Sequence, residues 1–381
     1  MIKEIQIENF KSIQSLNLEL GRLNVFIGAN GSGKSNILEA IAFGSAAIHD
    51  KLDSEFLYAR GVRKTDTRLI KSGFDNSHSS KSIDINLKFE NEDYYYPIKL
   101  DFDGGDTSSK LKRIGGFVVK FNVLLKELSY LIEKGIFNGE DDAKPALKYL
   151  EQQKAIESNI NDFLIFAPEN YFLRRFEEDS QIEPLGIRGE GLFSQLVKIS
   201  KEKPELFNKI NEYLDLLLDW FGGFEIPKDL MFTERRIKIK DRNLEEGLQY
   251  IDQRSANEGF LYLLFYFTLF ISKETPRFFA IDNIDNAMNP KLGRKLIKVL
   301  SKLAKEHDKQ AILTTHNPAI LDGLNLNNAE LDQRLFVVYR DADGATSVRR
   351  IMPKQVENGV TPVPLSEQFL RGYLGGLPDN F

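Results

Sequence analysis

The segment Gly28–Ser35 constrains the fold more than any other part of this sequence, because it matches the pattern G-x-x-x-x-G-K-[ST] at every fixed position. The apolar run Leu23–Ile27 predicts a buried strand before it, and residues 35–41 predict the start of a helix after it. Such a strand, glycine-rich turn and helix form a phosphate-binding loop, in which backbone N–H groups and the helix N-terminus hold an anion. In this loop Lys34 is expected to reach the β- and γ-phosphates of a nucleotide, and the Ser35 hydroxyl to bind Mg²⁺.

Length and composition set broad limits on the chain. Its 381 residues predict a core with a sizeable insertion or second lobe. With 51 Lys and Arg against 56 Asp and Glu, the formal charge is −5, so no overall basic balance indicates nucleic acid. The absence of cysteine excludes disulfides, thiolate zinc sites and cysteine nucleophiles, and a cytosolic location is the simplest expectation.

Neither the N-terminal residues nor the most apolar segment predicts a signal peptide or a membrane-spanning helix. Residues 1–7 alternate like a strand and lack an apolar region followed by a cleavage site, so we expect them in the mature fold. The most apolar segment, residues 259–271, is shorter than the roughly 20 residues that a bilayer needs. It therefore predicts a buried core helix.

Hydrophobic periodicity predicts the other elements. Strands are expected at 2–7, 13–20, 82–90, 94–103, 163–167, around 230–240, and in a hairpin of 335–340 and 345–351. Helices are expected within 117–134, 144–161, 191–203, 204–221 and 291–305, with a loop over 50–81.

A second motif lies near the C-terminal end of the chain. Residues 278–282 form an apolar run that ends in Asp282, which is typical of a Walker B strand whose carboxylate holds the metal through water. The next predicted strand, residues 310–315, is followed by His316, whose position favours a contact with a γ-phosphate. The other three histidines share no metal-ligand spacing with His316.

Together with residues 9–12, these motifs resemble the ABC-type ATPase heads of the RecF, SMC and OLD proteins and of AAA-labelled ATPases in bacterial antiphage systems. The resemblance implies an α/β head with mixed sheets around a P-loop core and a helical insertion. It implies three parts: residues 1–103 with the P-loop, 104–245 as an insertion with a Q-loop-like segment, and 246–381 with the remaining motifs. It also implies ATP and Mg²⁺ as ligands, with ATP-binding residues Lys11, Asn30, Gly31, Ser32, Gly33, Lys34, Ser35 and Asn36.

In that family the nucleotide lies between two heads, and a signature loop of one head faces the P-loop of the other. Residues 255–259 occupy the expected place of the signature loop, before the Walker B strand. With Gly259 as the fixed glycine, Asn257 stands where serine is usual and Ser255 lies two residues earlier, so either side chain is a candidate donor. An ordinary helix-capping motif explains the same residues and remains an alternative.

Asn283 is the main departure from the family. The residue after the Walker B aspartate is usually a glutamate that polarises the attacking water, and an amide cannot accept a proton at neutral pH. Losing a general base costs on the order of 10²–10⁴ in rate. We therefore expect tight ATP binding and slow hydrolysis, with Asp285 as the alternative base and residues 286–289 as the loop that touches the partner head.

Two weaker assignments complete the site. The resemblance gives Asn170 or Glu169 the metal and water role of the absent Q-loop glutamine, with an ordinary helix start as the alternative. Asp341 and Asp343 could form a nuclease metal pair, but Gly344 favours a β-turn.

The C-terminal residues 365–381 resemble ATPases of defence operons, including the Septu type. The prediction is an ATP-binding subunit that pairs with itself and regulates a nuclease or other effector, with DNA or RNA as a possible ligand and no membrane partner. The alternatives are a RecF-like DNA-clamping repair protein and a scaffold that binds ATP without hydrolysing it.

Overall fold

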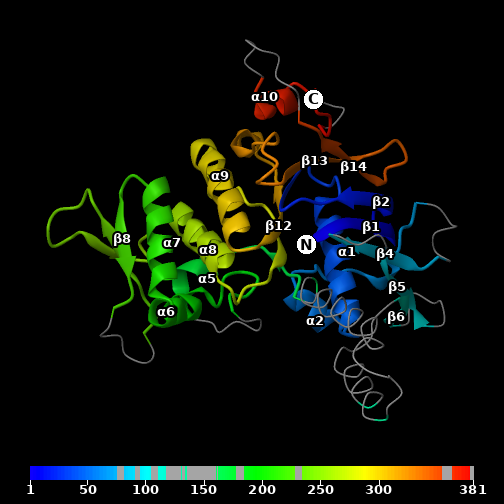
Figure 1. Cartoon of the computed structure of the whole chain (residues 1–381), viewed down its shortest axis with the longest axis horizontal. Coiled ribbons are helices and arrows are strands. Elements are labelled where there is room, and N and C mark those ends of the chain that lie inside the picture. Colours follow the sequence, from blue (N-terminus) through cyan, green and yellow to red (C-terminus); the bar gives the residue numbers. More distant parts are fainter. Residues whose placement is uncertain are drawn as a thin grey trace.

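The computed structural model describes residues 1–74, 81–90, 95–103, 110–116, 130, 134, 160, 162–176, 184–227, 234–353 and 363–377. Two sheets lie around helix α1 (Lys34–Ile48), and a group of helices with a small third sheet covers the face of the central sheet that is turned away from α1 (Figure 1). Within these residues no helix is long and apolar enough to cross a membrane.

A six-stranded sheet forms the centre of the molecule, with strand order β14-β13-β3-β12-β11-β7. All neighbouring strands are parallel except β14, which pairs antiparallel with β13. The strands are β3 (Leu23–Ile27), β7 (Ile165–Phe166), β11 (Phe278–Ile281), β12 (Gln310–Thr315), β13 (Gln333–Arg340) and β14 (Thr346–Ile351). Strands β3, β12 and β11 are fully buried because both faces of this sheet are covered.

A five-stranded antiparallel sheet covers one face, with strand order β2-β1-β4-β5-β6. Its strands are β1 (Ile2–Phe10), β2 (Ile13–Glu19), β4 (Ile83–Phe89), β5 (Tyr96–Phe102) and β6 (Leu111–Gly116). Helix α1 (Lys34–Ile48) contacts β1, β4 and β5. Phe26 of β3 points into the hydrophobic core that the central sheet shares with α1 and the five-stranded sheet. Its neighbours Val25 and Ile27 point into the core on the other face, as the alternation of a strand requires.

Helices form the other core. The central one is α8 (Glu258–Ile271), in which every residue from Phe260 to Ile271 is buried. Around it lie α5 (Asn170–Arg175), α6 (Leu192–Glu202), α7 (Pro204–Leu217) and α9 (Pro290–Glu306), together with the small sheet β8 (Phe221–Glu225), β9 (Lys238–Asp241) and β10 (Tyr250–Asp252). The remaining helical segments are α2 (Ser54–Ala59), η1 (Thr67–Leu69), η3 (Pro318–Gly323) and α10 (Leu365–Leu370).

Most predicted elements are confirmed, including the opening strand pair, the core helix α8 and the hairpin β13–β14. The expectation of a loop over 50–81 is wrong in part, because Asp53 caps the short helix α2 by accepting from the N–H of Phe56. Of the strand pair expected around 230–240, residues 230–233 lie outside the described residues, and β9 begins within the rest and pairs with β8 and β10. The helices expected within 117–134 and 144–161 fall almost entirely outside the described residues, and the division at 103 and 245 stays a prediction.

The C-terminal segments close over the outside of the P-loop. Thr346 of β14 donates a hydrogen bond to the carbonyl of Ser32, and Arg340 of β13 donates one to the carbonyl of Gly31. The N–H of Ala29 donates to the carbonyl of Gly376. The loop is thus held from outside, which leaves its inner side to face the site.

Candidate nucleotide site

Two P-loop glycines, Gly28 and Gly33, are required by close packing against β13 and β14. A Cβ atom on Gly28 would lie 2.0 Å from the carbonyl oxygen of Val338, and one on Gly33 would lie 1.9 Å from Oγ1 of Thr346. Gly33 also has a φ of 106°, in the left-handed region that favours glycine. The loop therefore curls tightly into the N-terminus of α1, whose free N–H groups suit an anion.

Lys34 is buried at the centre of the loop. Its Nζ donates to the carbonyls of Gly28 at 2.9 Å and Ala29 at 3.0 Å. Burial lowers the pKa of Lys34 to about 8, and the charges of Asp282 and Asp285 oppose that shift. These weak carbonyl partners can be exchanged for phosphate oxygens when a polyphosphate enters.

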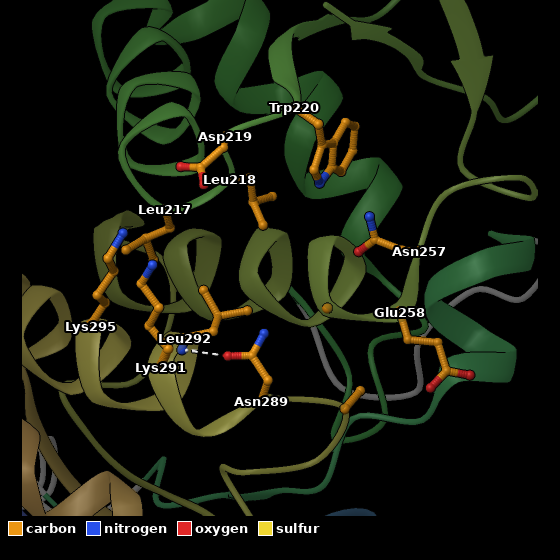
Figure 2. A pocket seen from close by; sticks show the side chains of 12 residues that line it. Leu217, Leu218, Asp219, Trp220, Asn257, Glu258, Asn289, Lys291, Leu292 and Lys295 are labelled. Atoms are coloured by element: carbon orange, nitrogen blue, oxygen red, sulfur yellow. Dashed lines mark hydrogen bonds between the residues drawn. The ribbon is translucent and has the colours of Figure 1, made fainter. Parts of the chain in front are cut away.

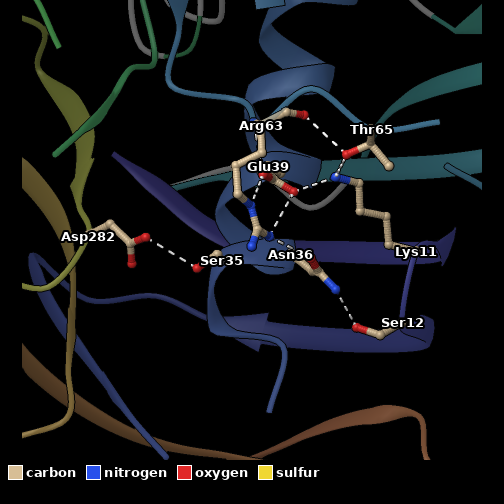
Figure 3. Close-up of polar contacts among 8 residues, drawn as sticks. All are labelled: Lys11, Ser12, Ser35, Asn36, Glu39, Arg63, Thr65 and Asp282. Carbon is tan, nitrogen blue, oxygen red and sulfur yellow. Dashed lines mark hydrogen bonds and ion pairs between the residues drawn. The ribbon is translucent and has the colours of Figure 1, made fainter. Parts of the chain in front are cut away.

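Ser35 and Asp282 lie together, as the sequence predicts for the metal side of the site. Oγ of Ser35 donates to Oδ2 of Asp282 at 3.2 Å (Figure 3). The other Asp282 oxygen accepts from Oγ1 of Thr314. A hydroxyl and a carboxylate are hard oxygen ligands that fit Mg²⁺, which usually takes one or two protein ligands and completes its shell with water and phosphates. The described residues contain no group of three His, Cys, Asp or Glu side chains that could hold a metal.

A pocket of about 330 Å³ opens beside these residues. Most of its lining was predicted from the sequence: Asn30, Gly31, Gly33, Lys34, Ser35, Asn36, Asp282, Asn283 and His316. Two arginines that were not predicted, Arg63 and Arg340, also line it. With Lys34 they give the pocket three cationic side chains against the carboxylate of Asp282, a balance suited to a polyanion.

Arg63 is held at the pocket by a buried carboxylate. Glu39 is 1% exposed and accepts from Nε of Arg63 at 2.7 Å and from Nζ of Lys11 at 2.6 Å (Figure 3). Burial alone would raise the pKa of Glu39, but the hydrogen bonds and charges of Arg63 and Lys11 lower it below its ordinary value. Arg63 also donates to Oδ1 of Asn36 at 3.0 Å.

Two predicted ATP-binding residues are not among those that line the pocket. Lys11 is paired with Glu39 and donates to Thr65 at 2.9 Å. Ser32 is buried, and its hydroxyl has no hydrogen-bond partner in the described part of the chain. Both belong to the support of the loop in this structure.

The side of the pocket where water would attack is built differently. Asn283 has a φ of 56°, and its N–H donates to Oγ1 of Thr314 at 2.9 Å. Burial, and then the charge of Lys34, lower the pKa of His316, so the imidazole is neutral at neutral pH. Asp285 does not line the pocket, but its charge acts on both Lys34 and His316, and its buried Oδ1 has no hydrogen-bond partner among the residues described.

The predicted signature residues lie at a second hollow of about 620 Å³ (Figure 2). Asn257 and Gly259 line it together with Ala287 and Asn289 of the loop after Walker B. Oδ1 of Asn257 accepts from the N–H of Phe260 at 2.8 Å, so Asn257 caps helix α8. This is the contact that the helix-capping alternative predicts for Asn257. Ser255 is exposed and is not part of this lining.

Asn170 is directed toward the signature segment. It begins α5, and its Nδ2 donates to Oε1 of Glu258 at 2.7 Å. Arg174 of the same helix donates to the carbonyls of Arg254 and Ala256. The structure thus places Asn170 outside the lining of the nucleotide pocket and links α5 to the loop before α8.

Comparisons with known proteins agree with this architecture. Residues 23–322 match the family described as "AAA domain, putative AbiEii toxin, Type IV TA system". The chain is 25% identical over 265 residues to a DNA replication and repair protein RecF of Leptospira interrogans, covering 64% of each chain. It is 27% identical over 305 residues to the chromosome partition protein Smc of Methanocaldococcus jannaschii, covering 68% of this chain and 25% of that protein.

A crystal structure of an Smc head bound to the C-winged helix domain of ScpA superposes with a TM-score of 0.56 at 17% identity, covering 93% of this chain and 98% of that one. An uncharacterized protein, MJECL10 of M. jannaschii, is 37% identical over 101 residues, which cover 25% of this chain and 44% of that protein. The matches span less than two thirds of the length of these curated relatives. The fold is that of an SMC-like ABC ATPase head, and this chain belongs to the AAA-domain family of ATP-binding proteins related to RecF, SMC and Rad50.

Proposed function

We propose that the chain is a nucleotide-held switch: it binds Mg²⁺-ATP tightly, pairs head to head around it, and hydrolyses it slowly. The observation that carries the proposal is the contrast within one pocket. Ser35, Asp282 and Lys34 are arranged for a metal-bound triphosphate, while Asn283 stands where a carboxylate base is usual.

The residues have separable roles in this proposal. Lys34, Arg63 and Arg340 neutralise the phosphates, and Ser35 and Asp282 would hold Mg²⁺. When bound, the metal would neutralise charge on the β- and γ-phosphates. Neutral His316 and the side-chain amide of Asn283 can orient a water molecule. The amide cannot accept the proton of that water.

The second half of the proposed site comes from another copy of the chain. Asn257, Gly259 and Ala287 line a hollow that shares no residue with the nucleotide pocket. In the head-to-head arrangement proposed here, this hollow faces the γ-phosphate bound by the partner. Helix α8 begins there, and its N-terminus favours an anion.

A slow switch suits control of another protein better than mechanical work. We propose that the closed pair regulates a separate nuclease or other effector in antiphage defence, with the Septu type as the model for such a partnership. The RecF relative supports a second candidate, a DNA-clamping repair protein, and Asn283 supports a third, a scaffold that keeps its ATP. The neighbouring genes distinguish the first two candidates: a nuclease gene found next to this one would favour the first.

Light-scattering mass with and without Mg²⁺-ATP tests the pairing. We expect the mass to double with ATP in the unchanged chain. Gly259→Asp should stay a monomer that still binds ATP, because the new carboxylate repels the partner's phosphate. Gly73→Asp is the matched control, since a side chain there has open space. An unchanged mass with saturating ATP, or doubling in Gly259→Asp, would refute the proposed pairing.

A further inference from the structure

Helix α9 carries a row of lysines on its exposed face. Lys291, Lys295, Lys298 and Lys302 follow one another at intervals of four, three and four residues. At 100° per residue, these four side chains lie within about 60° of one another around the helix axis. We call this set the lysine row.

The lysine row is not balanced by acidic neighbours. In the described part of the chain none of its four lysines forms an ion pair, whereas the flanking Arg294 and Lys305 pair with Asp322 and Glu330. Helix α9 contains no acidic residue before Glu306, which pairs with Lys209 of α7. Asp219 and Glu258 line the same hollow as Lys291 and Lys295, and in the described part of the chain neither carboxylate forms an ion pair with these lysines.

This arrangement costs helix stability. Like charges three or four residues apart destabilise a helix by about 0.2–0.5 kcal/mol per pair. The opposite face of α9 is anchored by buried Leu296, Leu300 and Leu303, so the fold tolerates the repulsion. A protein with a net charge of −5 that concentrates cations on one face presents a local surface for a polyanion.

We propose that, in the unpaired chain, the lysine row binds the sugar-phosphate backbone of double-stranded DNA. The row is about 16 Å long at 1.5 Å per residue, and its lysines are spaced by about 4.5–6 Å along a rigid helix. Regularly spaced point charges match a row of phosphates, and they carry no base-specific contacts.

The chemistry of the row favours a duplex over a single strand. Binding of single strands relies on aromatic side chains that stack with exposed bases. The row itself contains no aromatic residue. Trp220, which lines the same hollow as Lys291 (Figure 2), packs against Phe221 and Phe260. The proposed contact is therefore electrostatic and independent of sequence.

The test uses the full chain without nucleotide, so its result does not depend on the proposed function. Binding to a 30-base-pair DNA duplex is measured by fluorescence anisotropy from 50 to 200 mM NaCl. The variant Lys298→Gln with Lys302→Gln avoids the hollow that Lys291 and Lys295 line. Lys201→Gln with Lys238→Gln is the matched control, and Lys298→Arg with Lys302→Arg restores the charge.

We expect the Gln pair on α9 to weaken binding and to reduce the slope of log K against log salt by about 2, because each lysine lost removes about one released counterion. The control pair and the Arg pair should keep the slope of the unchanged chain. The proposal is overturned by absence of duplex binding at 50 mM NaCl, by an unchanged slope in the α9 Gln pair, or by tighter binding of duplex RNA or polyglutamate than of duplex DNA.

Discussion

The metal side of the nucleotide pocket and its water side are built in different ways. On the metal side, Ser35, Asp282 and Thr314 are already joined by hydrogen bonds. On the water side, Asn283 contributes an amide, and Asp285 holds a buried oxygen without a hydrogen-bond partner in the described residues. The difference teaches that binding and hydrolysis depend on separate residues, so substitutions should change one without the other.

The largest effect is expected from the network that supports the binding side. Glu39→Gln should lower the free energy of unfolding by about 3–4 kcal/mol, because it leaves the buried Lys11 ammonium without its carboxylate. It should also weaken ATP binding, since Arg63 loses its anchor. Urea unfolding gives the first value and calorimetry the second.

Glu19→Gln is the matched control, because Glu19 forms an exposed ion pair with Arg350. Loss of that pair should cost no more than about 1 kcal/mol. Equal destabilisation by the two variants would show that the Glu39 network gives the pocket no special support.

A somewhat smaller effect is expected on affinity at Lys34. Lys34→Met keeps the length of the buried side chain but removes the ammonium, and hydrogen bonds to charged groups contribute about 1.5–3 kcal/mol each. ATP affinity should fall by at least about 100-fold. Calorimetry measures it, and an affinity within a few-fold of the unchanged chain would break the assignment of Lys34 to the phosphates.

ATP affinity should depend on pH through the ammonium of Lys34. Since the pKa of Lys34 is lowered to about 8, the free protein loses this proton as pH rises through 8, and ATP binding must then take it up again. Affinity should fall by about tenfold between pH 7.5 and 9, the limit for one proton being tenfold per pH unit. Lys34→Arg stays charged and should lose this dependence; the same pH profile in both would assign it to another group.

Much of the nucleotide pocket could be predicted from the sequence, because the P-loop and the Walker B strand are local patterns. Arg63 and Arg340 could not, since a lone arginine beside a loop or at a strand end carries no periodic signal. Glu39 did carry one: an acidic residue within the apolar run Ile37–Ile41 indicates a buried partner. That signal predicts a cationic partner for Glu39, and the structure shows two, Lys11 and Arg63.

The backbone of the loop after Walker B, residues 283–287, was also beyond prediction. Asn283 and Ala287 both have positive φ, at 56° and 58°. Asparagine adopts this conformation readily, whereas glutamate does so at a cost. The departure from the family at position 283 therefore has a conformational consequence as well as a chemical one.

The smallest expected effect concerns that backbone. Ala287→Gly should stabilise the fold by about 0.5–1 kcal/mol, because relief of the left-handed strain exceeds the added freedom of the unfolded chain. Ala304→Gly, within the regular helix α9, should destabilise instead. Urea unfolding of both variants checks the contrast, and destabilisation by Ala287→Gly would contradict the strain.

Single-turnover hydrolysis of Mg²⁺-ATP, followed together with light-scattering mass, tests the central claim most directly. The chain is compared with Asn283→Asp, which suits the positive φ, with Asn283→Glu, which has the longer reach, and with Asn283→Gln, which has no base. We expect a slow unchanged chain that stays paired with ATP, and a gain of at least about 100-fold in a carboxylate variant but not in Asn283→Gln. Brisk hydrolysis by the unchanged chain that Asp285→Asn abolishes would contradict the account and make Asp285 the base.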